Sequence, residues 1–543
     1  MRRAVAVAVA ASKRVGGLRL GALLFSFVFG LNAYFFNGYG WNQTARYDPI
    51  WSFVEPGPHQ YTLRIDDFIT DEEVGINTGD FARNLEHDEH YYSNKAPGTS
   101  LLGVPVYFAL YHGERIAGLN PTSIQGVFVN AYLIHLWVTV LPVALSSLFF
   151  LALATRLTRS REQALTLTLV MYGGTLMLPF STMMWGHTTA AAFCVMSLAC
   201  FMNRGRRSLF WSGGLIGLAV LTDYGAAPIA LSLVAAAWIS SDRRPAIGAF
   251  MLGGLGPLML FGSYHWMLFG SPFKLASSYS PPEMISEGGY MGLFGRFQPG
   301  ALWGLTFGTA RGLFIFMPIL FLSVVVLGQM LRGHSGGSGA SGRVHPVATA
   351  ADDRWLLAGL ALANILAALV INASFNAWQG GVTAGARYQI AVLPFYGFLL
   401  TMLPTGPRWR RAILVLGAIS VVNMFIIASV SPMAPDALHG SPLLFSYAKV
   451  FTAIRTDLGF LPAPGLGASL SRGSLHLYPI YLMRDWGIGL TDPIVARWAT
   501  FNVGERLFGL RGTLSLLPVV LGCALLATAM RRSARADDDG GLH

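Results

Sequence analysis

The sequence has little charge and almost no cysteine. Only 12% of its 543 residues are charged, whereas soluble domains carry about 25%. The hydrophobic share is 53%, and the mean hydropathy is +0.50. These values exclude an ordinary soluble domain and predict an integral membrane protein with many spans.

The cysteines Cys194, Cys200 and Cys523 all lie inside apolar runs. They are predicted to be small core residues rather than disulfide partners or zinc ligands. The net charge of +11 would also suit a nucleic-acid-binding protein. The arginines, however, sit beside apolar segments, which indicates membrane topology and no nucleic-acid partner.

A membrane span needs about 20 apolar residues, and the chain offers about 12 such segments, with 11 to 13 allowed by their uncertain ends. The first follows N-terminal arginines and is interpreted as a retained span rather than a cleaved signal peptide. The predicted spans are residues 18–36, 124–153, 163–182, 188–203, 208–222, 225–240, 246–268, 312–331, 354–373, 389–405, 411–430 and 513–530.

Arginine clusters fix the predicted orientation of these spans. They precede the first span and follow the second, fourth, sixth, eighth, tenth and last. With twelve spans every cluster falls on one side, which the positive-inside rule makes the cytoplasm. Segment 101–117 is also apolar enough to cross, but counting it would place the cluster at 156–161 outside. We therefore predict that it is re-entrant or interfacial.

The expected fold is an all-α polytopic membrane protein with large external loops. Residues 1–430 form the transmembrane core, 431–512 an external loop or small subdomain, and 513–543 the last span with a cytoplasmic tail. Residues 333–353 are rich in Gly and Ser and are predicted to be a flexible linker.

The first external loop, 37–123, carries the densest set of ionisable residues. Acids, histidines, the paired tyrosines Tyr91 and Tyr92, and Lys95 come within a short stretch before a Pro-Gly turn. A solvated surface explains any single carboxylate of this loop. The combination of acids with Lys95 and the turn favours a functional site.

Four further polar clusters are predicted at the same face as this loop. They contain His187, Asp223 with Tyr224, Arg311, and Arg387. Each has a structural alternative: a satisfied histidine, a cap of a helical hairpin, or an arginine that snorkels to the interface. Their common location favours one shared cavity.

Arg387 lies in a loop with three glycines and flanking aromatics, where backbone can approach a ligand closely. Its planar, permanently charged fork suits phosphate. A carboxylate opposite several arginines suits a group-transfer reaction. In such a reaction the acid activates a hydroxyl, and the cations neutralise a leaving phosphate. In a membrane, that phosphate is expected to belong to a lipid carrier.

Three segments then resemble a known family. Tyr91-Tyr-Ser-Asn-Lys95-Ala-Pro97-Gly98 resembles the Lys-Pro-Pro or Lys-x-Pro-Gly segment that closes the first external loop of the GT-C glycosyltransferase superfamily. Arg311-Gly312-Leu-Phe-Ile-Phe-Met-Pro318 is similar to the Arg-Gly-Leu-(x)3–4-Pro segment of its bacterial branch. Trp378-Gln-Gly380-Gly381 through Gly385-Ala-Arg387-Tyr388 is similar to a Trp-x-Gly-Gly-(x)3-Gly-x-Arg-Tyr segment.

The likeness runs in order over residues 18–405 and does not include 431–512. The superfamily includes the bacterial RgtA/B/C/D-like group, protein O-mannosyltransferases and the aminoarabinose transferase of lipid A. The resemblance implies an inverting transfer from a polyprenyl-phosphate-linked sugar to a glycan, lipid or protein acceptor. It places the reaction at the periplasmic face of a bacterial inner membrane, among membrane lipid.

The resemblance also implies residue roles, beginning with an acid of the first loop as base. Many relatives carry an Asp-Glu pair before an aromatic-Ala step, whereas here Phe81-Ala82 follows Asn77-Thr-Gly79-Asp80. Asp80 is therefore the expected base, and the alternates are Asp66, Asp67, Glu72 and Glu73. The expected phosphate contacts are Lys95, Arg311 and Arg387. The expected cavity residues are Tyr91, Tyr92, His187, Asp223, Tyr224, Trp378 and Tyr388. No metal ligand is assigned, although some relatives need a divalent cation and the acidic loop could hold one.

Two other functions stay open. The first is a multi-span transporter or flippase of lipid-linked saccharides, and the second is a ligase that joins a lipid-linked glycan to another acceptor. A transporter is disfavoured because the outer loops are far larger than the inner ones, no internal repeat is visible, and the ionisable residues lie at one surface rather than at the bilayer midplane.

Overall fold

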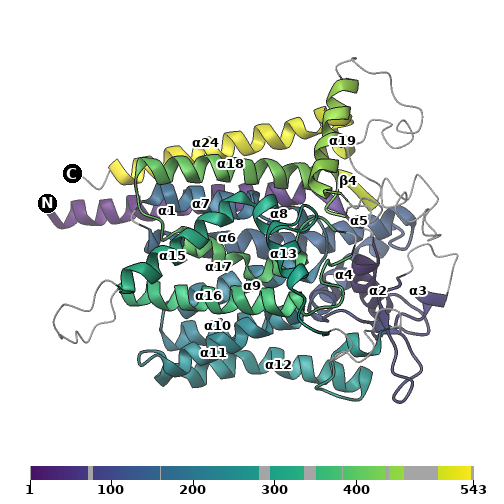
Figure 1. Cartoon of the computed structure of the whole chain (residues 1–543). Coiled ribbons are helices and arrows are strands. Elements are labelled where there is room, and N and C mark those ends of the chain that lie inside the picture. Colours follow the sequence, from purple (N-terminus) through teal and green to yellow (C-terminus); the bar gives the residue numbers. More distant parts are fainter. Residues whose placement is uncertain are drawn as a thin grey trace.

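The computed structural model describes residues 2–38, 40–70, 78–158, 160–280, 294–335, 350–381, 383–433, 440–457 and 499–539. Within these ranges the chain is predominantly helical, and most of the long helices lie side by side in one bundle (Figure 1). The helices of the bundle are α1 (Arg2–Ala33), α5 (Ile124–His135), α6 (Leu141–Leu157), α7 (Arg161–Gly173), α9 (Gly186–Phe201), α10 (Arg206–Thr222), α11 (Ala227–Ile239), α12 (Ile247–Phe269), α15 (Phe321–Ser335), α16 (Ala350–Ala373), α17 (Leu393–Leu400), α18 (Pro407–Val430) and α24 (Leu517–Asp539).

Five segments of the described chain are long and apolar enough to cross a membrane. They are Ile124–Leu157, Arg244–Phe269, Asp353–Ala373, Pro407–Val430 and Gly512–Ala534. Each of the twelve predicted spans falls largely on helical residues. The prediction of an all-α chain with membrane-spanning helices is therefore supported, and the number of twelve crossings stays a prediction.

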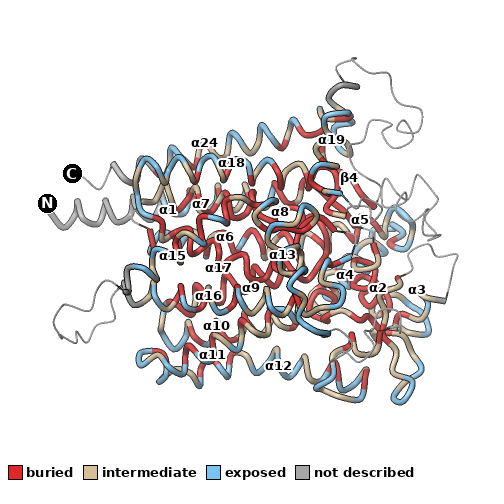
Figure 2. Tube along the Cα trace, in the orientation of Figure 1, coloured by how far each residue is buried: buried red, intermediate tan, exposed pale blue. Residues whose placement is uncertain are grey.

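The core of the bundle surrounds α9, whose residues are buried over almost its whole length. This helix packs between α6 and α10. The outer helices α12 and α24 are instead mostly exposed or half-buried along their length (Figure 2). Their exposed large apolar side chains include Leu258 and Trp266 of α12 and Leu525 of α24. A surface of this kind suits contact with lipid rather than with water.

One end of the bundle collects the arginines, and we name it the arginine end. Arg204 and Arg243 reach Asp353 Oδ1 at 2.5 Å and 3.3 Å, and Arg156 lies 3.9 Å from Asp353 Oδ2. Both chain termini point to this end in Figure 1. Three of the clusters that are predicted to share one side of the membrane, those with Arg156, Arg204 and Arg243, thus meet at one end of the molecule.

The opposite end, which we name the loop end, carries the first loop. It contains α2 (Trp41–Val54), α3 (Asp67–Thr70), α4 (Gly98–Ile116) and the paired strands β2 (Phe81–Ala82) and β3 (Tyr92–Ser93). Segment 101–117 lies almost entirely in α4, beside α2. It is not among the five segments above, and its predicted non-spanning role stays a prediction.

The late region 431–512 is tied to the start of the first loop. Strand β1 (Phe35–Asn37) pairs antiparallel with β4 (Thr500–Asn502), with Phe36 opposite Phe501. The region also contributes α19 (Pro442–Asp457) and α23 (Val503–Phe508). Residues 458–498 lie outside the described chain, so the predicted subdomain is seen only at its two ends.

Candidate functional site

The candidate site begins at the hairpin of β2 and β3. Phe81 pairs with Ser93. Asp80 directly precedes β2, and Lys95 follows β3 closely, so antiparallel pairing brings the two residues to the same end. Lys95 Nζ lies 2.9 Å from Asp80 Oδ2. The structure therefore joins the predicted base and a predicted phosphate contact in one ion pair.

This ion pair is mostly shielded from water, with the Lys95 side chain 19% exposed and that of Asp80 16% exposed. Burial lowers the pKa of Lys95 below its usual value, the Asp80 charge opposes this effect, and the nearby charges of Arg387 and Arg46 add to it. Lys95 thus sits in the field of two further cations, and an anion that entered here would be attracted by all three.

Arg46, from α2, is a residue of this site that the sequence reasoning missed. Its Nη1 donates to Thr99 Oγ1 at 2.9 Å, and its Nε donates to Asn42 Oδ1 at 3.1 Å. Burial lowers the pKa of Arg46 to about 10, while the charges of Asp223 and Asp80 raise it. The guanidinium therefore lies within the influence of both carboxylates of the site.

Two glycines allow the segments of the site to meet. A Cβ on Gly98, at the start of α4, would lie 2.7 Å from the carbonyl carbon of Leu221. A Cβ on Gly186 would lie 2.3 Å from Thr222 O and 3.3 Å from Arg46 Nη1. The lysine turn and the start of α9 therefore both touch the backbone at the end of α10, which leads into Asp223.

His187 and Asp223 form the second acid–base pair of the site. His187 Nδ1 contacts Asp223 Oδ2, while Asp223 Oδ1 accepts a hydrogen bond from the Gly225 backbone N–H at 2.9 Å. Burial opposes ionisation of Asp223, but His187, this backbone bond and Arg46 outweigh it, so the pKa of Asp223 falls to about 2. The structure confirms the capping role that is considered for Asp223, whose side chain caps the turn that begins at Tyr224, while its role in a shared cavity stays a prediction.

Arg387 lies between two aromatic rings beside His187. Its guanidinium carbon is 4.7 Å from the centre of the Trp185 ring and 4.8 Å from that of Tyr388. Its Nη2 donates to the Tyr388 hydroxyl at 2.9 Å, and its buried Nε has no hydrogen-bond partner among the described residues. The Tyr388 ring meets His187 edge-on, with centroids 5.7 Å apart. Arg387 therefore keeps a donor for an additional acceptor.

Arg311 is placed differently from the prediction. Its Nε donates to the Gln379 carbonyl at 2.6 Å, and its Nη2 donates to the Gly381 carbonyl at 2.7 Å. The fork that was expected to contact phosphate thus binds the backbone of the glycine-rich loop that leads to Arg387. Trp378 of the same loop packs against Gly304, in α13 (Pro299–Phe307).

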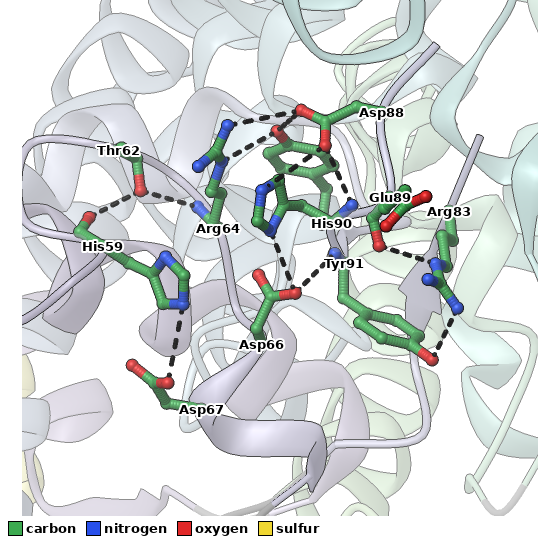
Figure 3. Close-up of polar contacts among 11 residues, drawn as sticks. His59, Thr62, Arg64, Asp66, Asp67, Arg83, Asp88, Glu89, His90 and Tyr91 are labelled. Carbon is green, nitrogen blue, oxygen red and sulfur yellow. Dashed lines mark hydrogen bonds and ion pairs between the residues drawn. The ribbon is translucent and has the colours of Figure 1, made fainter. Parts of the chain in front are cut away.

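The remaining predicted residues of the first loop belong to another polar cluster (Figure 3). Tyr91 stacks under Arg83 at 4.7 Å, and the Tyr92 hydroxyl donates to Asp88 at 2.8 Å. Asp66 and Asp67 contact histidines there. Glu72 and Glu73 lie outside the described residues.

Tyr224, next to Asp223, directs its hydroxyl to His265 Nε2 at 2.9 Å.

The structure therefore gathers five of the predicted residues around Arg46: Asp80, Lys95, His187, Asp223 and Arg387. Three cations against two carboxylates leave one net positive charge when His187 is neutral. Such a site can bind an anion and still offer a carboxylate to a second group.

Comparison of the chain with protein-family models, curated proteins and solved structures gave no match. What the site does is therefore inferred from its own geometry.

Proposed function

We propose that this chain is a membrane glycosyltransferase that takes a sugar from a polyprenyl-phosphate carrier. The loop end would face the outside of a bacterial inner membrane, where the carrier phosphate and an acceptor can both enter. The observation that carries the proposal is the Asp80–Lys95 ion pair beside Arg46 and Arg387.

The proposed reaction is a single displacement that inverts the sugar. The acceptor hydroxyl oxygen forms a bond to C1 of the sugar, while the bond between C1 and the phosphate oxygen breaks. The hydroxyl proton passes to Asp80, which acts as general base. The bonding electron pair leaves with the polyprenyl phosphate, whose charge Lys95, Arg46 and Arg387 neutralise.

The ion pair gives this reaction an order. While Asp80 is held by Lys95, its carboxylate is a weak acceptor for a hydroxyl proton. When a phosphate enters, Lys95 turns to it and releases the carboxylate. Arg387 supplies its unpartnered Nε to the same phosphate. The base is thereby exposed only after the donor has bound.

His187 and Asp223 have a supporting role in this proposal. Asp223 holds one nitrogen of the imidazole, and the ring packs on Tyr388, which in turn accepts a hydrogen bond from Arg387. This chain of contacts positions Arg387. Arg311 supports the same loop from the other side through its backbone carbonyls.

The experiment is a carrier-release assay with the full chain in lipid nanodiscs. Labelled polyprenyl-phosphate sugars are supplied with a mixture of acceptors, and free carrier phosphate is measured. Lys95→Met is expected to lower release by about 100-fold or more, because a developing charge loses its neighbouring cation. Lys274→Met is the matched control, since Lys274 is exposed and lies over the Tyr279 ring.

Two outcomes would contradict the proposal. One is carrier release that is equal in Lys95→Met and Lys274→Met. The other is movement of intact lipid-linked sugar between the leaflets of proteoliposomes without any release, which would identify the chain as a flippase.

A further inference from the structure

A separate cluster of two histidines and three aspartates lies in the first loop. One potential ligand atom from each of His59, Asp66 and His90 lies within 4.8 Å of the other two. Figure 3 shows the two imidazole rings and the Asp66 carboxylate turned toward a common space, with Asp67 beside His59 and Asp88 beside His90. None of these residues belongs to the Asp80–Lys95 site.

Backbone contacts hold the two segments of this cluster against each other. The Ile65 N–H donates to the Tyr91 carbonyl at 2.8 Å, and the Tyr91 N–H lies 3.3 Å from Asp66 Oδ1. The His90 N–H donates to Asp88 Oδ1 at 2.9 Å. The two segments that carry these side chains therefore cross at a fixed position.

The hydrogen bonding of the histidines points to a missing ligand. His59 Nδ1 is buried and has no hydrogen-bond partner among the described residues, while its Nε2 faces Asp67 at 3.6 Å. His90 Nδ1 lies 3.3 Å from Asp66, and its Nε2 lies 3.7 Å from Asp88. Each ring thus has a carboxylate near its Nε2, and for His90 this carboxylate lies at the nitrogen that is turned away from Asp66. Metal-bound histidines commonly show this arrangement, because the outer carboxylate orients the ring.

We propose that His59, Asp66 and His90 bind a divalent transition metal of the zinc type. Two imidazole nitrogens and a carboxylate oxygen suit zinc better than calcium or magnesium, which prefer all-oxygen sites. With metal–ligand bonds of about 2.1 Å, tetrahedral donors lie about 3.4 Å apart. The His90–Asp66 pair already has this spacing. Only His59 has to approach, and a water molecule completes the fourth position.

The metal would clamp residues 59–66 to residues 88–90. Asp88, the outer partner of His90, also accepts from Arg64 and from Tyr92, the first residue of β3. The clamp therefore fixes the strand that leads to Lys95. The metal site does not depend on the proposed glycosyl transfer, so either proposal can fail without the other.

The experiment measures Zn²⁺ binding to the full chain in detergent, after removal of any affinity tag and treatment with a chelator. Calorimetry and elemental analysis are expected to show one tightly bound equivalent and a higher melting temperature. His59→Gln and His90→Gln are expected to weaken binding by about 100-fold or more. Asp67→Asn is expected to weaken it by about 10-fold to 100-fold, as for other outer partners of ligating histidines.

His112→Gln is the matched control, because His112 is an exposed histidine on α4 that packs on Phe108. Equal melting temperatures of the metal-free variants and metal-free wild type would show that each variant folds. The proposal is overturned if no Zn²⁺ binds, or if binding in His59→Gln and His90→Gln equals that of His112→Gln.

Discussion

At the scale of single residues, the candidate site depends on what Asp80 can do while Lys95 holds it. Lys95 Nζ lies 2.9 Å from Asp80 Oδ2, so this oxygen is engaged and is not available to a hydroxyl group. It becomes effective when its partner is drawn away by a phosphate. Asp80 and Lys95 are thus proposed to act in sequence, and each can be tested by itself.

Replacing Asp80 by Asn tests the base. The amide keeps the size of the side chain but cannot take up a proton at neutral pH. We expect donor binding to persist, because the three cations of the site remain while one of its two carboxylates is lost. Carrier release should fall by about 10²-fold to 10⁴-fold. Binding and single-turnover release would be measured on the same preparation.

Glu86→Gln is the control for this substitution, since Glu86 is an exposed acid of the same loop. Normal turnover in Asp80→Asn would show that Asp80 is not the base.

The pKa of Lys95 predicts how donor binding changes with pH. Burial lowers this pKa below the usual lysine value of 10.5. The positive charge is therefore present at neutral pH and is lost as pH rises through the lowered pKa. We expect donor affinity to decrease as the pH rises. The decrease should begin at a lower pH than for an ordinary lysine, whose pKa is 10.5. Affinity would be measured between pH 7 and pH 9, a range that stays below the pKa of about 10 of Arg46.

Lys95→Arg provides the comparison for this pH dependence, because arginine stays charged over the whole range. The alkaline loss should disappear in that variant. If donor affinity decreased in the same way in the wild type and in Lys95→Arg, the decrease would come from a group other than Lys95.

The residues of the site could be predicted only in part from the sequence. His187, Asp223 and Arg387 stand out because each is a polar exception beside apolar segments, whereas Lys95 stands out because it lies in a loop dense in ionisable residues. Arg46 does not stand out, because the sequence of residues 37–123 predicts a single loop and gives no signal for α2 within it. The sequence also does not show which groups an arginine guanidinium contacts. The guanidinium of Arg311 binds backbone carbonyls.

At the scale of elements, α10 and α12 show how helices pack here without large side chains between them. A Cβ on Gly213 would lie 1.9 Å from Phe250 O, and one on Gly253 would lie 1.9 Å from Phe210 O. The two contacts are reciprocal, so the backbones touch at both points. Small residues at such crossings are typical of membrane helices, which gain their association from close packing.

Gly253→Ala is therefore expected to destabilise the protein. The new methyl group would collide with a backbone carbonyl that cannot move without shifting a helix, which costs about 1–3 kcal/mol. Gly256→Ala, three residues later on the same helix, places its methyl group where no atom lies within 4 Å. It should be neutral or stabilising by up to about 1 kcal/mol, since alanine favours helix. Melting temperatures in one detergent would be compared, and equal values would contradict this packing.

The long helices could be predicted because their apolar length is a strong signal. The shorter elements could not. Helix α2 is buried on nearly all sides at the loop end, so it carries charged and aromatic residues without a clear apolar stripe. The pairing of β1 with β4 joins residues that are far apart in the chain, and no local sequence pattern predicts it.

At the scale of the whole molecule, the two ends of the bundle differ in chemistry. The arginine end holds the ion pairs around Asp353. The loop end holds the first loop, the candidate site and the histidine cluster. If the arginine end lies in the cytoplasm, as basic connections favour, the candidate site and the histidine cluster both lie on the outer side of the membrane.

Cysteine labelling tests this orientation in intact cells. Leu85 is 68% exposed at the loop end, and Ser241 is exposed beside Arg243 and Arg244 at the arginine end. We expect a membrane-impermeant maleimide to label Leu85→Cys directly and Ser241→Cys only after permeabilisation. The native cysteines give a low background, because Cys194 is buried and the other two are partly buried. Reversed labelling would place the candidate site in the cytoplasm and exclude transfer at the outer face. Labelling of both variants from outside would mean that the two ends of the bundle do not lie on opposite sides of the membrane.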